Sequence, residues 1–335
     1  MPTPSPALPE LRWFNAADVE AAMPPLEERL RLAEVTLTAF ARPGAAEMPP
    51  KIAIHPRPTA AFVHAMPAHL RSDERGDLVG MKWVAGYATN TALGLPGISA
   101  LVIVNDPATG IPTAILDGGP ITAQRTAAVS GVAIRRFGPA QPAGLDVALI
   151  GTGIQGRSHL PVLAHLLPGA RLHVFDADAA RAEAFAELAR SHDGIAEVRV
   201  HATAREAVEP AAVVVTAASF GPPELNQPMT NEWLRPDATV VPIDYDTYCA
   251  ASVARDAALF LVDQREQYLF TRAAGSFAGY PDPMATIGEA IVAETPRPDG
   301  RVVVAHLGVG LADLVFSDAI VRAATAMGRG TVLAR

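Results

Sequence analysis

Cysteine is almost absent from this sequence, since Cys249 is the single one among 335 residues. One cysteine excludes a framework of internal disulfides, so nothing points to an oxidising compartment. Half of the residues are hydrophobic, yet no uninterrupted apolar run reaches the ~18 residues that a membrane-spanning helix needs. Residues 1–6 show no basic region followed by an apolar stretch. No signal peptide is therefore expected, and the expected location is the cytoplasm.

Clusters of positive charge are also missing. The formal net charge is −8, with 27 lysines and arginines against 35 aspartates and glutamates, which argues against nucleic acid as a partner. The histidines do not suggest a metal site either. His64 and His69 are five residues apart, which is neither a helical metal-binding spacing nor one face of a strand. The length suggests about two domains with a sizeable core.

The most informative segment is a buried-strand pattern that runs into G-x-G-x-x-G at Gly151, Gly153 and Gly156. In a dinucleotide-binding turn the first glycine allows the tight bend and the second lets the pyrophosphate approach the backbone. The third lets the following helix pack closely on the strand. Ile154 and Gln155 lie at the helix start, where backbone N–H groups hold phosphates. The motif predicts a dinucleotide site.

An acid at the end of the next predicted strand indicates which dinucleotide is bound. Asp176 follows Gly156 by 20 residues. An acid in this place accepts hydrogen bonds from the ribose hydroxyls and repels a 2′-phosphate, which favours NAD(H) over NADP(H). Further along, Ala217 and Ser219 follow a strand pattern and are expected to contact the cofactor, and residues 219–223 its nicotinamide half.

The first part of the chain predicts helices followed by an antiparallel sheet. Asn15 can cap a helical region that continues to Phe40 and that Pro24-Pro25 breaks into two helices. Short, closely spaced strand patterns with turns between them favour antiparallel pairing. These strands are expected at residues 51–55, 60–67, 80–86, 98–105 and 112–117, with a long helix at 122–137.

From Asp146 onward strands and helices alternate, which predicts a doubly wound parallel sheet of the Rossmann type. The expected strands lie at 146–150, 171–176, 198–202, 212–216, 239–243 and 259–262, with helices from 156 and at 179–191. A last helix at 311–327 is expected to return to the antiparallel domain. The expected domains are a discontinuous α+β substrate-binding and dimerisation domain at 1–124 and 311–335, and an NAD-binding Rossmann domain at 125–310.

Four blocks of residues resemble the ornithine cyclodeaminase/mu-crystallin family. They are residues 81–90 with Lys82, residues 121–128 with Arg125, the glycine motif, and residues 307–313. The similarity runs from about Met48 to about Ala324. It implies an NAD(P)(H)-linked fold in which two antiparallel sheets associate into a barrel across a homodimer. It also implies chemistry at the Cα–N bond of an amino acid, by cyclodeamination, imine reduction or oxidative deamination.

The resemblance and the residues themselves together give a candidate site. Lys82 lies in an otherwise apolar strand, where it is expected to bind the substrate carboxylate or to assist proton transfer. The alternative is an outward-facing lysine of an alternating strand. Arg125 lies on a helix of small and apolar residues, where its guanidinium fork matches a substrate carboxylate or, alternatively, a structural acid. Thr122 is expected to contact cofactor or substrate through its hydroxyl.

Two assignments leave alternatives open. Lys51 occupies the position where the family often supplies a second cation for the carboxylate, with Arg57 as a competitor. Asp244 matches the position of the family's catalytic aspartate and is also expected beside the cofactor, with Asp246 as the alternative. The glycines and the Pro-Gly-Lys turn that accompany this aspartate in the family are absent here, which makes ornithine the less favoured substrate. Residues 271–283 are a further candidate for lining the pocket.

The predicted function is NAD(H)-dependent imine reduction or amino acid oxidation at the Cα–N bond of a small substrate. One alternative is ornithine cyclodeamination, which yields L-proline and ammonia with recycled NAD. A second is a mu-crystallin-type protein that binds nucleotide or ligand without turnover. The expected partners are the small amino or imino acid and a second copy of the chain. No metal is predicted.

Overall fold

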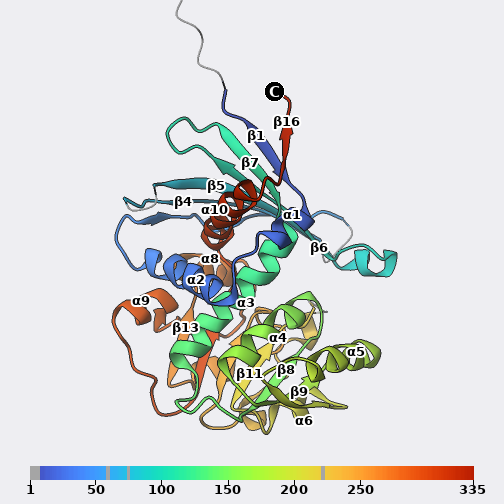
Figure 1. Ribbon diagram of the computed structural model, residues 1–335. Helices are drawn as coiled ribbons and strands as arrows, with labels where there is room; N and C mark the ends of the chain where they lie inside the picture. Colours follow the sequence, from blue (N-terminus) through green and yellow to red (C-terminus); the bar gives the residue numbers. More distant parts are fainter. Residues whose placement is uncertain (1–7, 58–60, 74–75, 220–222) are drawn as a thin grey trace, which may run out of the picture. The chain divides into compact units, whose positions relative to one another are not determined.

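The computed structural model describes residues 8–57, 61–73, 76–219 and 223–335. Three of the expectations above fall on residues outside these ranges. They concern the N-terminal segment examined for a signal peptide, residue 60 of the strand expected at 60–67, and residues 220–222 of the segment expected near the nicotinamide. The chain divides into two compact units (Figure 1). The first comprises Met1–Pro25, Gly44–Thr122 and Gly310–Arg335, and the second Leu26–Pro43 and Ala123–Val309.

The first unit is built on a single sheet, which is antiparallel apart from the parallel pairing of β1 with β7. Its strand order is β16-β1-β7-β6-β5-β4-β2, and β3 also pairs with β4. The strands are β1 (Leu11–Phe14), β2 (Ala46–Glu47), β3 (Ile52–Ile54), β4 (Ala61–Leu70), β5 (Leu78–Tyr87), β6 (Ile98–Asn105), β7 (Pro112–Asp117) and β16 (Thr331–Leu333). The helices are α1 (Ala16–Ala21), a 3-10 helix at Ala88–Leu93, the start of α3 (Gly118–Phe137), and α10 (Gly310–Ala326).

Helix α10 covers one face of this sheet and belongs to the same compact unit. Two glycines permit the close approach. A Cβ on Gly80 of β5 would lie 2.7 Å from Leu314 Cδ1, and a Cβ on Gly310 would lie 2.6 Å from the carbonyl oxygen of Met66. The residues of β5 alternate between the buried face under α10 and a partly exposed face, as the period of a strand requires.

The second unit contains an all-parallel sheet in the order β10-β9-β8-β11-β12-β15-β13-β14. Its strands are β8 (Asp146–Ile150), β9 (Ala170–Phe175), β10 (Ile195–Val200), β11 (Val213–Thr216), β12 (Thr239–Pro242), β13 (Leu259–Val262), β14 (Ala285–Thr286) and β15 (Val302–Ala305). Its helices are α2 (Leu26–Phe40), most of α3, α4 (Ile154–Leu166), α5 (Ala179–Arg190), α6 (Ala204–Val208), α7 (Ala251–Arg255), α8 (Arg265–Ala273) and α9 (Ile287–Val292). Short 3-10 helices lie at Pro223–Leu225 and Asn231–Trp233.

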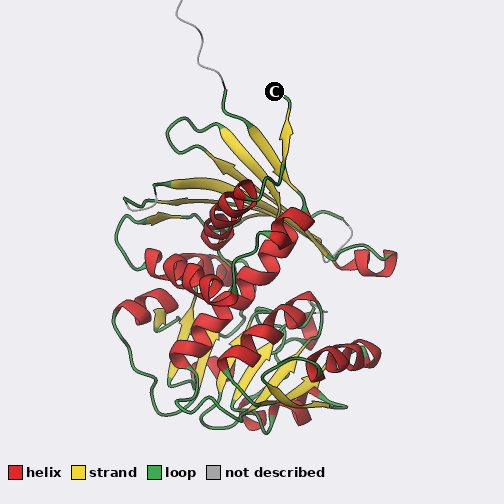
Figure 2. Ribbon diagram, viewed as in Figure 1, coloured by secondary structure: helices red, strands yellow, loops and turns green. Residues whose placement is uncertain are grey.

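Helices lie on both faces of this parallel sheet (Figure 2), so two separate cores form. Val147 and Leu149 of β8 belong to the core under α4 and α5. Ala148 and Ile150 belong to the core that contains residues of α6, α7 and α8. Strands that are apolar on both faces are typical of a doubly wound sheet, and this predicted architecture is confirmed.

Local sequence signals fixed several elements. The Asn15 side chain accepts a hydrogen bond from the Asp18 N–H at the start of α1, as expected for its cap. The chain breaks between α1 and α2 at Pro24-Pro25, and β6, β7, β8 and β13 have the predicted bounds. β15 and α6 to α9 were not predicted. Among the described residues no helix is both long and apolar enough to cross a membrane.

The segment Leu26–Pro43 differs from the expected division, which put residues 1–124 in one domain. It belongs to the second unit because α2 packs on α9 and α3. A Cβ on Gly288 of α9 would lie only 1.9 Å from the Leu37 carbonyl oxygen, so the two backbones touch. Glu27 of α2 also accepts two hydrogen bonds from Arg135 of α3, at 2.8 and 2.9 Å.

Candidate active site

The glycine motif forms the turn between β8 and α4 in the second unit. Gly151 has a positive φ of +92°, and a Cβ there would lie 2.4 Å from the Ala217 carbonyl oxygen. A Cβ on Gly156 would lie 2.3 Å from the Gly151 carbonyl oxygen, whereas one on Gly153 would meet nothing within 4 Å. The glycines therefore have the local geometry that the motif predicted: a tight bend, open space above the second glycine and close packing of the helix.

The neighbouring predicted cofactor residues lie around this turn. Ile154 is 59% exposed at the start of α4. Gln155 follows it and is half-buried. Ala217 directly follows β11 and contacts Gly151, and Ser219 is exposed two residues further on. All four are at the carboxyl ends of parallel strands or the helix start beside them, where nucleotides bind in such sheets.

Asp176 directly follows β9 and is tied to the glycine turn. Its Oδ2 accepts hydrogen bonds from the N–H and the hydroxyl of Thr152, both at 2.8 Å. Its Oδ1 accepts from the Asp178 N–H at 2.9 Å and lies 3.9 Å from Arg181 Nη1. These bonds hold the carboxylate at the place where an acid meets the ribose of a dinucleotide.

Asp244 follows β12 by two residues and is bonded to the end of the adjacent strand β11. Its Oδ1 accepts from the Thr216 hydroxyl at 2.7 Å, and its Oδ2 accepts from the Ala218 N–H at 3.0 Å. Burial raises the pKa of Asp244 to about 7, although these two hydrogen bonds act in the opposite direction. A carboxyl with this pKa can donate or accept a proton near neutral pH.

Asp246, the alternative to Asp244, has different surroundings. Its Oδ2 accepts a hydrogen bond of 3.4 Å from Gln227 Nε2, and the same nitrogen donates to the Ala278 carbonyl at 3.0 Å. Asp246 therefore helps to tie together three loops, whereas Asp244 is held beside Ala218, next to the glycine turn. The geometry favours Asp244 as the acid at the cofactor edge.

Arg125 is buried on α3, with 5% exposure. Its two terminal nitrogens point toward Gly308, because a Cβ on this glycine would be 2.5 Å from Nη1 and 2.8 Å from Nη2, nearer than the 3.0 Å to Cζ. Gly308 has a positive φ of +81° and follows the end of β15. The glycine thus leaves room for the fork of the arginine at the carboxyl edge of the sheet.

In the first unit, Lys82 lies on the buried face of β5. Its Nζ is 2.7 Å from Asp313 Oδ2 of α10 and 3.5 Å from the Thr122 hydroxyl. The alternative interpretation of Lys82 as an outward-facing lysine is therefore wrong, because Trp83 takes the exposed face instead. Asp313 belongs to a block of the sequence that carries the family resemblance, but it was not predicted as a site residue. Only its contact with Lys82 identifies it.

Lys51 and Lys82 act on one histidine of the same unit. Burial is the main cause that lowers the pKa of His64 to about 3, with further contributions from the charges of Lys51, His55 and Lys82. Lys51 precedes β3, whose Ala53 pairs with His64 of β4. His64 was set aside in the sequence because it fits no metal spacing. Two of the charges that lower its pKa, those of Lys51 and Lys82, are the cations expected to bind a carboxylate.

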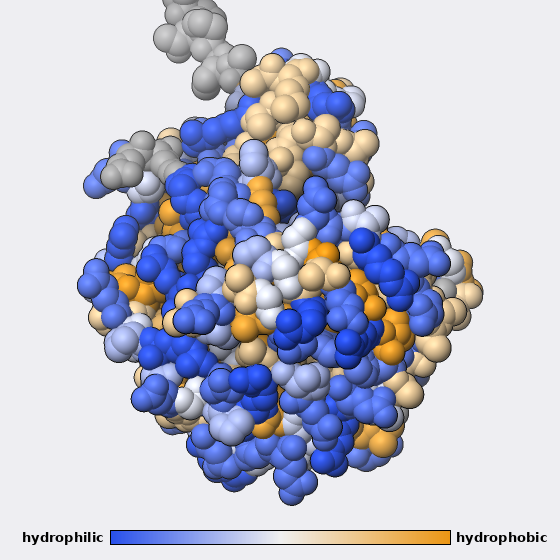
Figure 3. All heavy atoms as spheres, turned by 60° about the horizontal axis from the view of Figure 1, so that its bottom comes forward, coloured by the Kyte–Doolittle hydropathy of each residue, from blue (hydrophilic) through white to orange (hydrophobic). Residues whose placement is uncertain are grey.

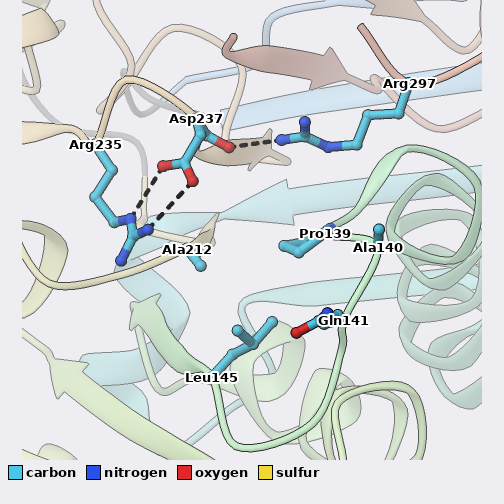
Figure 4. A pocket seen from close by; sticks show the side chains of 8 residues that line it. All are labelled: Pro139, Ala140, Gln141, Leu145, Ala212, Arg235, Asp237 and Arg297. Atoms are coloured by element: carbon cyan, nitrogen blue, oxygen red, sulfur yellow. Dashed lines mark hydrogen bonds and ion pairs between the residues drawn. The ribbon is translucent and has the colours of Figure 1, made fainter. Parts of the chain in front are cut away.

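A surface hollow of about 270 Å³ lies elsewhere in the second unit (Figure 4). It is lined by Pro139, Ala140, Gln141, Leu145, Ala212, Arg235, Asp237 and Arg297. Several of these residues directly precede strands, so the hollow lies at the amino edge of the sheet, opposite the glycine turn. Arg235 donates two hydrogen bonds to the Asp237 carboxylate, from Nε to Oδ1 at 3.1 Å and from Nη2 to Oδ2 at 3.2 Å. Arg297 donates to the Asp237 carbonyl at 2.6 Å.

The family model of the ornithine cyclodeaminase/mu-crystallin family matches residues 15–322. The chain belongs to this family. The resemblance read from the sequence blocks is confirmed. Among relatives in the family, the nodulation efficiency protein NfeD of Rhizobium meliloti is 33% identical over 331 residues, which cover 96% of this chain and 98% of that protein. Ketimine reductase mu-crystallin of Mus musculus is 29% identical over 260 residues, 76% of this chain and 78% of that protein.

Solved structures show the same fold. The Delta(1)-pyrroline-2-carboxylate reductase of Thermococcus litoralis, in complex with NADH and L-proline, matches this family member with a TM-score of 0.84. The match has 24% identity and covers 96% of this chain and 100% of that one. The predicted fold class, a Rossmann-type parallel sheet with a second domain built on an antiparallel sheet, is confirmed.

Proposed function

We propose that this protein is an NAD(H)-dependent oxidoreductase that acts at the Cα–N bond of a small α-imino or α-amino acid, as an imine reductase or amino acid dehydrogenase. The observation that carries the proposal is Asp244. A buried acid whose pKa is about 7 is bonded to Thr216 and Ala218, beside the dinucleotide turn. The names of the relatives, which include a ketimine reductase, support the same class of reaction.

The bound nicotinamide would exchange a hydride with the substrate Cα. Reduction of an imine adds this hydride to carbon and a proton to nitrogen, whereas oxidation of the amine removes both. Asp244 in its protonated form donates the proton to the nitrogen, and as a carboxylate it takes one back. The pKa of about 7 allows both directions at neutral pH.

The remaining residues bind and orient the substrate. Arg125 binds the substrate carboxylate through its planar fork, and Lys51 adds a second positive charge. Lys82, whose ammonium is held by Asp313 at 2.7 Å, assists proton movement from a fixed position. Fixing the carboxylate orients Cα for the hydride, and such orientation lowers a barrier by several kcal/mol, on the order of 7 or more in favourable cases.

Asp176 supports NAD(H) rather than NADP(H) as the cofactor. Its carboxylate is fixed at the end of β9 by the two bonds from Thr152, where it meets the ribose hydroxyls and repels a 2′-phosphate. The glycine turn, Ile154, Gln155, Ala217 and Ser219 hold the rest of the dinucleotide.

The test is the change in NADH absorbance on mixing with a panel of substrates. The panel pairs NADH with cyclic imines such as Δ1-pyrroline-2-carboxylate, and with keto acids plus amines, and pairs NAD with L-amino acids. A net change that depends on substrate, and that is lost in Asp244→Asn, is the expected result. Conversion of ornithine to proline with only catalytic NAD would establish the cyclodeaminase instead. Bound nucleotide without any turnover would favour a binding protein.

We further propose that the exposed face of the antiparallel sheet is a homodimer interface. Ile52, Ala65, Trp83 and Leu101 form one cross-strand row, and the three large side chains are 63%, 44% and 41% exposed. A row of exposed apolar side chains on a monomer marks an interface. By contrast, the face of the molecule drawn in Figure 3 is mainly hydrophilic, with hydrophobic residues in small separate groups.

Sedimentation analysis tests this interface. The chain is expected to be a dimer. The Leu101→Glu variant is expected to be a monomer, because dimer formation would bury the unpaired charge of the new carboxylate in the interface. Leu188→Glu is the matched control, since Leu188 of α5 is 43% exposed but lies in the other unit. A monomeric parent protein, or a Leu101→Glu variant that stays dimeric, would contradict the proposal.

A further inference from the structure

The turn at Leu307 and Gly308 is the surface against which the Arg125 guanidinium rests. The contact between Gly308 and the two terminal nitrogens of the guanidinium leaves no space for a side chain, and the positive φ of +81° would strain any residue other than glycine. The orientation of the fork therefore depends on where the Gly308 backbone is held. Both polar groups of this backbone unit are bonded to side chains of one short segment, at the end of β13 and the first turn of α8.

Asp263 holds the N–H side of the turn. Its Oδ2 accepts from the Leu307 N–H at 2.9 Å and from the Gly308 N–H at 2.7 Å. Its Oδ1 accepts from the Gln264 N–H at 2.9 Å. Asp263 is fully buried, and burying a carboxylate is costly unless several donors compensate its charge. Two of these donors come from the turn beside Arg125.

Gln267 holds the carbonyl side. Its Nε2 donates to the Gly308 carbonyl oxygen at 3.1 Å. This bond fixes the assignment of the amide, because only the nitrogen can donate to a carbonyl. Gln267 is 1% exposed, and its Oε1 is buried and accepts no hydrogen bond from the part of the chain that the structure describes. The side chain therefore keeps an unsatisfied acceptor while it bonds Gly308.

We propose that Asp263 and Gln267 are positioning residues for substrate binding. They fix the Gly308 backbone, and Gly308 sets the position of the two terminal nitrogens of Arg125, whose fork receives the substrate carboxylate. The inference rests on the proposed role of Arg125 as that clamp. A bidentate pair depends on the relative orientation of two planar groups, so a turn that moves by a fraction of an ångström weakens carboxylate binding without removing the cation.

Steady-state kinetics of Gln267→Met tests the proposal. Methionine keeps the length of the side chain but loses the donor. We expect the KM for Δ1-pyrroline-2-carboxylate, or for whichever imine of the panel is reduced, to rise about tenfold, with kcat within about threefold of the parent. The dissociation constant of NADH should not change. Asp263→Asn should give the same pattern with a larger rise in KM.

Thr286→Ala is the control for a purely structural effect. It removes the capping box of α9, where Thr286 and Glu289 bond each other's backbone N–H, and so lowers stability by about 1 kcal/mol. Its KM should stay at the parent value. If Thr286→Ala raises the KM as much as Gln267→Met does, loss of stability explains the effect and the proposal is wrong.

A double-variant cycle decides whether Gln267 acts through Arg125. Arg125→Lys keeps the charge but loses the fork, so it should raise the KM by itself and make the orientation set by Gly308 unimportant. Adding Gln267→Met to Arg125→Lys should then change the KM less than twofold. An undiminished tenfold effect in that background would overturn the inference.

If Arg125→Lys raises the KM but Gln267→Met does not, only this inference fails. If Arg125→Lys leaves the KM unchanged, the proposed clamp fails with it.

Discussion

Lys82 of β5 and Asp313 of α10 form an ion pair in which Nζ lies 2.7 Å from Oδ2, and the side chains are only 1% and 0% exposed. Burial of either charge alone would be very costly in free energy, so each residue compensates the buried charge of the other. The last helix of the chain therefore supplies the partner of a lysine in an early strand. This pair fixes the ammonium in the position from which we expect it to act.

Asp313→Ala is expected to lower the free energy of unfolding by about 3–5 kcal/mol, because it leaves the Lys82 charge buried without this carboxylate. Urea denaturation measures this loss. Lys82→Met combined with Asp313→Leu should recover much of the stability, since an apolar pair needs no compensation, yet it should remain inactive. Full activity in the stable double variant would show that Lys82 has no role in the reaction.

The pH dependence of the reaction should report Asp244. Because burial raises its pKa to about 7, kcat for imine reduction should fall as the pH rises above about 7 and the acid loses the proton that it donates. Asp244→Asn should remove this limb and lower kcat by about 10²–10⁴-fold. A pH profile of Asp244→Asn with the same limb would assign the titration to another group.

Stability should depend on the same group. The folded-state pKa of Asp244, about 7, lies above the ordinary aspartate value of 3.8. Its contribution to stability is therefore fully present below about pH 4 and is lost as the pH rises through about 7. Above pH 7, Asp244→Asn should be more stable than the parent by up to about 4 kcal/mol. Denaturation of both proteins at pH 5 and pH 8 measures the difference, which should be about 2 kcal/mol at pH 5 and about 4 kcal/mol at pH 8.

A buried hydrogen-bonded chain joins His306, Ser130 and His159 within the second unit. His159 Nδ1 lies 2.7 Å from the Gln155 carbonyl oxygen and therefore donates. Neutral His159 then accepts at Nε2 from the Ser130 hydroxyl, and Ser130 Oγ accepts in turn from His306 Nε2, each at 2.8 Å. Ser130→Ala removes both bonds and should lower the free energy of unfolding by about 2–3 kcal/mol, as measured by urea denaturation.

Burial lowers the pKa of His159 to about 4 from 6.5. The unfolded chain therefore binds a proton between pH 6.5 and 4 that the folded protein does not bind. Stability should fall across this window as the pH is lowered, by up to about 3 kcal/mol, and then level off. His159→Gln should reduce this slope. Asp244 titrates in an overlapping window with the opposite sign, so each variant is compared with the parent at several pH values. An unchanged slope in His159→Gln would disprove the assignment.

Cofactor preference should depend on Asp176. Asp176→Ser removes the negative charge that repels a 2′-phosphate, and the Arg181 guanidinium, now 3.9 Å from the Asp176 carboxylate, would remain to attract that phosphate. The ratio of kcat/KM for NADPH to that for NADH should rise by about 10-fold or more. Arg181→Ala in the same background should reverse part of this gain. A parent protein that already prefers NADPH would contradict the expected role of Asp176.

Local signals in the sequence determined much of this protein. Three examples are the glycines of the β8–α4 turn, the cap at Asn15 and the break at Pro24-Pro25. Each acts on residues close by in the sequence, so the local structure can be predicted from the sequence alone. Alternating and continuous apolar patterns likewise distinguish the antiparallel sheet from the parallel one. Arg125, Lys82 and Asp244 were found because their residue types and positions match the family, although their roles in catalysis stay predictions.

Tertiary structure decided which residues meet. Asp313 becomes the partner of Lys82 only because α10 packs on β5, and Asp244 is distinguished from Asp246 only by its bonds to β11. Helix α2 joins the second unit because Gly288 leaves space for its backbone. None of these contacts has a local signature, since each depends on backbones that are distant in sequence and approach through burial of apolar surface. The sequence alone shows that a charged residue in an apolar segment needs a partner of opposite charge. Only the packed fold decides which residue becomes that partner.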